Sequence, residues 1–159
     1  MRQMSPRQQL QTAARDALES YLTELPLSGS LGVTLTLRQG DHLGRLDEVG
    51  ASKNLRHFLN RLNSEVLGKR FKRFGTRLNV VPVLERSHAG RLHYHLVLEN
   101  PFPDDPLRSD ALIEQEWTKT RFGYRETHID HQIDQGWVRY ITKSKDASDG
   151  IDWDNFHWN

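Results

Sequence analysis

Hydrophobic and polar residues alternate in three stretches of the chain, and each stretch predicts a β-strand. In residues 31–38 (LGVTLTLR) every second residue is apolar, and residues 77–85 (RLNVVPVLE) and 92–99 (LHYHLVLE) are rich in β-branched and leucine residues. The six residues RSHAGR between the last two stretches suit a hairpin loop. Pro82 favours an edge position for its strand. A fourth strand is expected over residues 122–130.

Apolar residues at helical spacing predict four helices around these strands. The first follows a capping box at Ser5 and stops at Pro26. The second is expected to be capped by Ser52 and to end at Gly68, the third covers residues 109–120, and the fourth runs from Asp134 to about Lys145. This mixed order predicts an α+β fold, with an antiparallel sheet and helices packed mainly on one face.

Length and composition limit the classes of protein that fit. The 159 residues allow one domain, which we expect at 29–145, with an N-terminal helical extension at 1–28 and an acidic, aromatic tail at 146–159. The absence of cysteine excludes disulfides, thiolate zinc sites and cysteine nucleophiles. No apolar run approaches the roughly 18 residues of a membrane span, and no apolar leader is seen at the start. We therefore expect a cytoplasmic protein without membrane partners.

The net charge of +1 conceals a basic central segment. Eight Lys or Arg residues lie between residues 51 and 77, where Glu65 is the sole acidic residue. Interleaved with Phe71 and Phe74, they suggest contacts with a nucleic-acid backbone; a solvated helix face is the alternative. The candidate nucleic-acid-binding residues are Lys69, Arg70, Lys72, Arg73 and Arg77.

Two histidines on one strand are the sharpest chemical feature. His93 and His95 are two residues apart, so a strand projects both from the same face. Glu85, at the end of the preceding strand, comes near His93 if the hairpin closes, and it is the candidate third ligand. Two imidazoles and a carboxylate can bind Mg²⁺, Mn²⁺ or Zn²⁺. Alternatively, both histidines are exposed polar residues of an amphipathic strand. We expect ordinary surface or packing roles for the histidines His88, His128 and His131.

A tyrosine and a lysine share one face of the last predicted helix. Tyr140 and Lys143 are three residues apart, and an ammonium group beside a phenol favours the nucleophilic phenolate. A tyrosinate can attack a phosphodiester to form a covalent phosphotyrosine. The alternative is a chance spacing on a helix whose other face is buried.

The order of these features resembles the HUH endonuclease superfamily, which includes rolling-circle replication initiators and single-tyrosine transposases. The first family motif resembles Val33-Thr34-Leu35-Thr36-Leu37, the second His93-Tyr94-His95, and the third Tyr140-Ile141-Thr142-Lys143. The resemblance covers roughly residues 31–145 and looks most like plasmid or viral Rep proteins. It implies a ferredoxin-like sheet that binds single-stranded DNA.

The resemblance also implies roles for individual residues. Tyr140 would attack the DNA and become joined to the 5′ phosphate, and Lys143 would help to position the metal or the tyrosine. His93 and His95, with Glu85 as the third ligand, would hold one Mg²⁺ or Mn²⁺. With one candidate tyrosine in the last helix, we expect a single-tyrosine enzyme without a helicase domain of its own, so a helicase is a candidate partner. The residues also leave open a non-cutting nucleic-acid-binding module and a metal-dependent phosphodiesterase.

Overall fold

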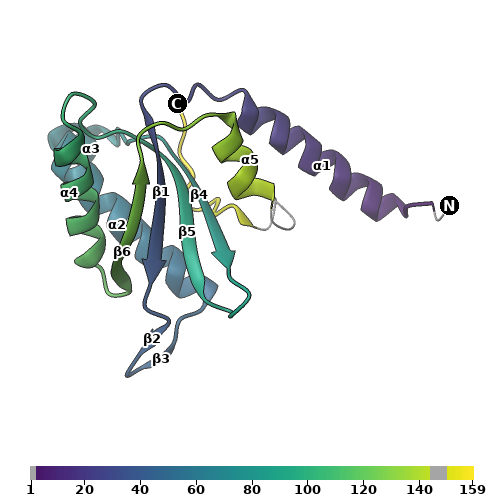
Figure 1. Ribbon diagram of the computed structural model, residues 1–159, viewed down its shortest axis with the longest axis horizontal. Coiled ribbons are helices and arrows are strands. Elements are labelled where there is room, and N and C mark those ends of the chain that lie inside the picture. The colour runs from purple at the N-terminus through teal and green to yellow at the C-terminus, as the bar shows by residue number, and fades with distance from the viewer. Residues whose placement is uncertain (1–2, 144–149) are drawn as a thin grey trace.

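The computed structural model describes residues 3–143 and 150–159, and its centre is a four-stranded antiparallel sheet (Figure 1). The strand order is β4-β5-β1-β6, and a short hairpin of β2 and β3 projects from one end. The strands are β1 (Ser30–Leu37), β2 (Gly40–Asp41), β3 (Gly44–Arg45), β4 (Val80–Arg86), β5 (Leu92–Glu99) and β6 (Gly123–Asp130). The helices are α1 (Pro6–Thr23), α2 (Glu48–Leu67), α3 (Lys69–Phe74), α4 (Pro106–Thr118) and α5 (Gln135–Lys143).

One face of the sheet forms the larger hydrophobic core beneath α2 and α4. The apolar face of β1 and the Leu92, Tyr94, Leu96 and Leu98 side chains of β5 meet the α2 stripe there. Phe58 of α2 packs edge-on against Trp117 of α4, with ring centroids 5.3 Å apart. This arrangement confirms the predicted α+β fold and the inward-facing side of the histidine-bearing strand.

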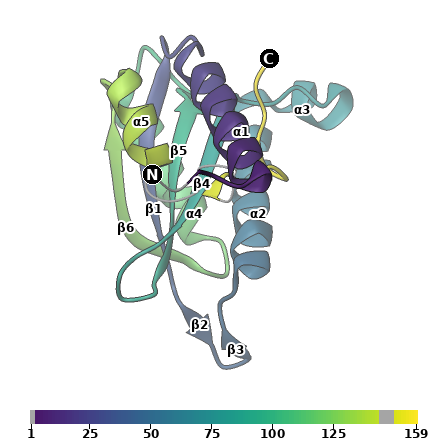
Figure 2. The same cartoon turned by 90° about the vertical axis from the view of Figure 1, so that its right-hand side faces the viewer.

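The opposite face carries a second hydrophobic cluster, covered by α5, the end of α1 and the C-terminal segment 150–159 (Figure 2). Val81, Val83 and Val97 project from the sheet into this cluster. Leu22 and Leu25 from the end of α1, with Val138 and Ile141 from α5, cover them. The buried area explains why α1 is held at its C-terminal end, while most of its N-terminal residues are exposed.

Several boundaries differ from the sequence-based predictions. Helix α2 begins at Glu48, because Asp47 caps it by accepting a hydrogen bond from the Gly50 N–H and an acidic first turn suits the helix dipole. The prediction that Ser52 caps this helix is wrong. The predicted hairpin, the edge position of Pro82 and the end of α2 at Gly68 are confirmed. The predicted extension of α5 to Lys145 lies outside the described residues.

The acidic C-terminal segment packs back on the domain along the outer edge of β4. His157 pairs with Val80 through two backbone hydrogen bonds, and Ile151 forms a bridge to Val83. The pairing covers part of an edge strand that would otherwise expose unpaired backbone groups. No helix in the described part of the chain is long and apolar enough to cross a membrane.

Asp152 is the polar anchor of this segment. Its carboxylate accepts hydrogen bonds from the Tyr94 hydroxyl at 2.8 Å and from Ser52 at 3.1 Å, while its own N–H bonds to the Pro82 carbonyl. Burial, reinforced by the adjacent carboxylate, raises the pKa of Tyr94 and keeps its hydroxyl protonated as a donor. The segment is thus tied to α2, β4 and β5 by one side chain.

This anchor can be tested by removing either partner. Asp152→Ala leaves the buried Tyr94 hydroxyl without its acceptor and should lower the free energy of unfolding by about 2–3 kcal/mol. Tyr94→Phe removes the donor but leaves Asp152 bonded to Ser52 and Asn155, so it should cost about 1 kcal/mol. Urea denaturation measures both. Equal losses would show that the buried hydroxyl does not depend on Asp152.

Candidate metal centre

The register of the β4–β5 hairpin brings three ligand-type side chains together. Glu85 of β4 lies directly opposite His93 of β5, as the parity of the two strands predicts. His95 lies two residues further along β5, and all three side chains project from the face that carries Val81, Val83 and Val97. The sequence-based prediction that Glu85 comes near His93 is confirmed.

The three ligand atoms converge on a common point. The Nε2 atoms of His93 and His95 are 3.1 Å apart, and Glu85 Oε2 lies 2.9 Å from His95 Nε2 and 3.4 Å from His93 Nε2. Donors that surround one ion at about 2.1 Å lie roughly 3.0 Å apart at right angles and roughly 3.4 Å apart in a tetrahedron. The observed separations therefore fit a group that could hold one metal ion.

His95 is the most enclosed of the three ligands. It is 6% exposed, and the Thr34 hydroxyl on β1 lies 3.1 Å from its Nδ1 atom. This contact orients the ring so that Nε2 faces Glu85 and His93, as is common for histidines that bind metals. Burial and the neighbouring His93 lower the pKa of His95, although Glu85 acts in the opposite direction. A neutral imidazole, the form that binds a cation, is thereby favoured.

Helix α5 holds Tyr140 beside this group. The Tyr140 ring centroid lies 6.0 Å from that of His95, and the side chain is 63% exposed. Trp137, one turn earlier, packs at 5.8 Å from both rings. Val138 and Ile141 bury the other side of the helix, so the amphipathic pattern turns Tyr140 outward at the edge of the metal centre.

A glycine on β1 gives α5 its close seat on the sheet. A Cβ atom added to Gly32 would lie 2.7 Å from Ile133 and 2.9 Å from the Trp137 ring. Both contacts are shorter than van der Waals packing allows, so a side chain here would push Trp137 away. Thr34, Gly32 and Trp137 escaped the sequence analysis as site residues, since their contacts depend on the β1–β5 register and on the docking of α5.

The remaining candidate residues lie apart from this group. Lys143 is the last residue of α5, and its side chain lies outside the described residues. The four cations of α3 and the nearby Arg77 lie beyond the C-terminal end of α2, on the opposite side of the sheet from α5 (Figure 2). His88 is exposed, His128 is exposed on β6, and His131 bonds to Asp110 at 2.7 Å.

The antiparallel sheet and its Glu–His–His group define a rolling-circle Rep type of protein. Residues 30–147 match the model of the replication-associated protein ORF2 family, and the match covers well over half of the chain. The chain belongs to this family, in agreement with the HUH resemblance of its motifs. Comparison with curated proteins and with solved structures finds no match.

Metal binding gives a direct test of the centre. Calorimetric titration with Mn²⁺ at pH 7.5 should show one site, and His95→Ala should weaken binding at least tenfold because it removes the central ligand. Affinity should fall as the pH drops below about 6.5, where the imidazoles gain protons that compete with the cation.

The matched control is His88→Ala, which removes an exposed hairpin-loop histidine and should leave the titration unchanged. Equal losses in the two variants would contradict a centre built on β4 and β5.

Proposed function

We propose that this protein nicks single-stranded DNA and transfers the cut strand through a covalent 5′-phosphotyrosine, in the initiation of rolling-circle replication. The observation that carries the proposal is the exposed Tyr140 ring beside the Glu85–His93–His95 group. Membership of a replication-associated family supports nucleic acid as the substrate class. Strand transfer during single-strand transposition would use the same chemistry.

Each residue of the centre has a distinct role in this proposal. Glu85, His93 and His95 would hold one Mg²⁺ or Mn²⁺, which supplies positive charge to offset that of the phosphate under attack. The Tyr140 oxygen attacks phosphorus, loses its proton and becomes bonded to the 5′ phosphate, while the bond to the 3′ oxygen breaks and that oxygen leaves as a 3′-hydroxyl. Reversal of the reaction with another 3′-hydroxyl rejoins the strand and frees Tyr140.

Two further sets of residues would assist the substrate. Lys143, three residues after Tyr140 on α5, is proposed to favour the phenolate or to help position the metal. Lys69, Arg70, Lys72, Arg73 and Arg77 are proposed to bind phosphates of the strand outside the nick. A helicase that unwinds the template is the partner expected for an initiator.

Covalent adduct formation tests the nucleophile. Wild-type protein incubated with labelled single-stranded origin DNA and Mn²⁺ should give a labelled band that survives denaturing electrophoresis. Tyr140→Phe removes the attacking oxygen and should abolish the adduct, because phenylalanine cannot form a phosphoester.

Tyr124→Phe is the control, since Tyr124 lies on β6 and outside the metal centre. An adduct that persists in Tyr140→Phe would disprove the assignment. Metal-dependent cleavage without any adduct would indicate the phosphodiesterase, and DNA binding without cleavage the non-cutting module.

The seat of α5 provides a second test that leaves the ligands intact. Gly32→Ala should push Trp137 outward and displace Tyr140 from the phosphate, so the rate of adduct formation should fall by about 100-fold. Mn²⁺ affinity, set by Glu85, His93 and His95, should remain within about twofold. A parallel loss of metal binding and adduct formation would mean that the substitution disturbs the sheet rather than the position of α5.

A further inference from the structure

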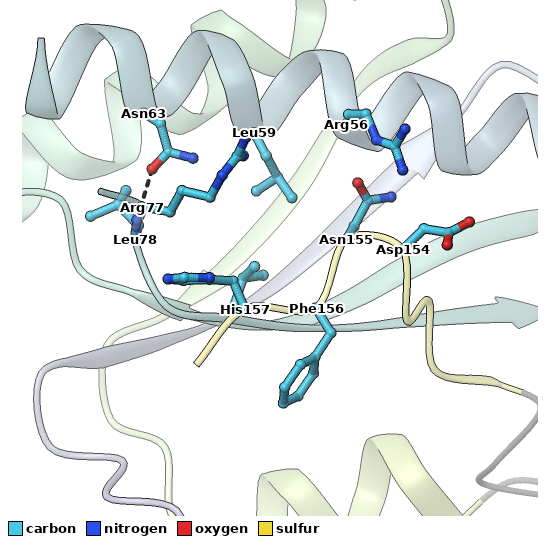
Figure 3. Close-up of a pocket in the computed structure, with 10 residues that line it drawn as sticks. Arg56, Leu59, Asn63, Arg77, Leu78, Asp154, Asn155, Phe156 and His157 are labelled. Carbon is cyan, nitrogen blue, oxygen red and sulfur yellow. Dashed lines mark hydrogen bonds between the residues drawn. The ribbon is translucent and has the colours of Figure 1, made fainter. Parts of the chain in front are cut away.

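A second concave site lies at the edge of β4, between α2 and the C-terminal segment (Figure 3). Its volume is about 390 Å³, near the lower end of the range for small-ligand pockets. Arg56 and Asn63 enter it from α2, and Asn155 and His157 enter from the C-terminal segment. Leu78 and Val80 belong to the core beneath α2, so the site opens on the opposite side of the sheet from the metal centre.

The polar groups of this site favour an anion. Arg56 and Arg77 both line it, and within the described part of the chain neither forms an ion pair. Arg77 bonds only to a neutral amide, the Asn60 oxygen, at 3.2 Å. The Nε2 atom of His157 is buried without a hydrogen-bond partner. Asp154, an exposed residue, is the acidic member of the lining.

The site continues into the basic helix α3 through one side chain. The Arg77 guanidinium lies 5.0 Å from the centre of the Phe71 ring on α3, in cation–π geometry. On the same helix Phe74 is 78% exposed, and Lys72 and Arg73 occupy the last turn. Exposed aromatic rings among cations are the pattern by which single strands are bound through base stacking and phosphate contacts.

We propose that this pocket binds a phosphate, with its nucleotide, from a segment of the DNA strand outside the nick. Guanidinium groups bind phosphate oxygens in a paired geometry, and the unpartnered His157 nitrogen can donate a further hydrogen bond. The pocket and α3 together form a contact surface on the α2 side of β4, separate from the residues that hold the reacting phosphate. The proposal rests on the proposed function, because it takes DNA as the substrate.

Binding measured without divalent metal separates this surface from the metal centre. Fluorescence anisotropy with a labelled single-stranded origin oligonucleotide in EDTA should show that Arg56→Gln weakens binding by about tenfold. The slope of log affinity against log salt should become shallower by about 0.7, the value for one lost phosphate contact on a single strand. Arg7→Gln removes the same charge from an exposed position on α1 and should leave both quantities nearly unchanged.

The opposite change should strengthen binding. Asp154→Asn removes the negative charge from the lining and should raise affinity about twofold to threefold, with a steeper salt dependence. In the complex, the His157 ring should show an NMR chemical-shift change on titration with the oligonucleotide, while the exposed His42 ring should not. Arg56→Gln and Arg7→Gln variants of equal affinity, or an unmoved His157 signal, would overturn the proposal.

The adduct assay distinguishes this failure from failure of the proposed function. If wild-type protein forms the Tyr140 adduct while Arg56→Gln binds as tightly as wild type, the pocket proposal alone is wrong. If no adduct forms but the Arg56→Gln and Asp154→Asn effects appear, the pocket binds nucleic acid and the nicking proposal is wrong.

Discussion

The pairing of Glu85 with His93 across the β4–β5 hairpin is the constraint on which the metal centre depends. A shift of one residue in this pairing would turn the Glu85 side chain to the α2 face and separate it from both histidines. The same shift would move Val81 and Val83 out of the cluster that packs beneath α5 and the C-terminal segment. Burial of these apolar side chains therefore stabilises the register that brings the three ligands together.

Helix α5 links packing to chemistry on this face. Its apolar side seals the second hydrophobic cluster, and its opposite side carries Tyr140. The depth of the helix is set by the absence of a side chain at Gly32, and a bond from the Trp137 indole N–H to the Leu96 carbonyl, at 3.3 Å, ties it to β5. The phenol is held by the same strand that carries both histidines, so the distance between nucleophile and ligands is a property of the sheet.

Most of the sheet and the ligand group could be predicted from the sequence, because strand alternation has a period of two and places His93 and His95 on one face. The hairpin length then limited the partner of His93 to the end of β4. The second layer could not be predicted. Ile151, Phe156 and Trp158 are isolated apolar residues in an acidic stretch without periodicity, and only long-range contacts with β4 and α1 give them a place in the fold. The contact between Thr34 and His95 likewise depends on the β1–β5 pairing.

The two sides of the sheet divide the demands of a DNA-cutting protein. Strand β4 connects them, because Val80 lines the arginine pocket and Glu85, five residues and about 17 Å further along, belongs to the metal centre. A DNA strand that occupies both must pass around the edge formed by β4 and the C-terminal segment. Asp152 ties that segment to Tyr94, the residue between the two histidines. The edge is thus held to the same strand that aims the ligands, which keeps the path between phosphate binding and phosphate attack constant in length.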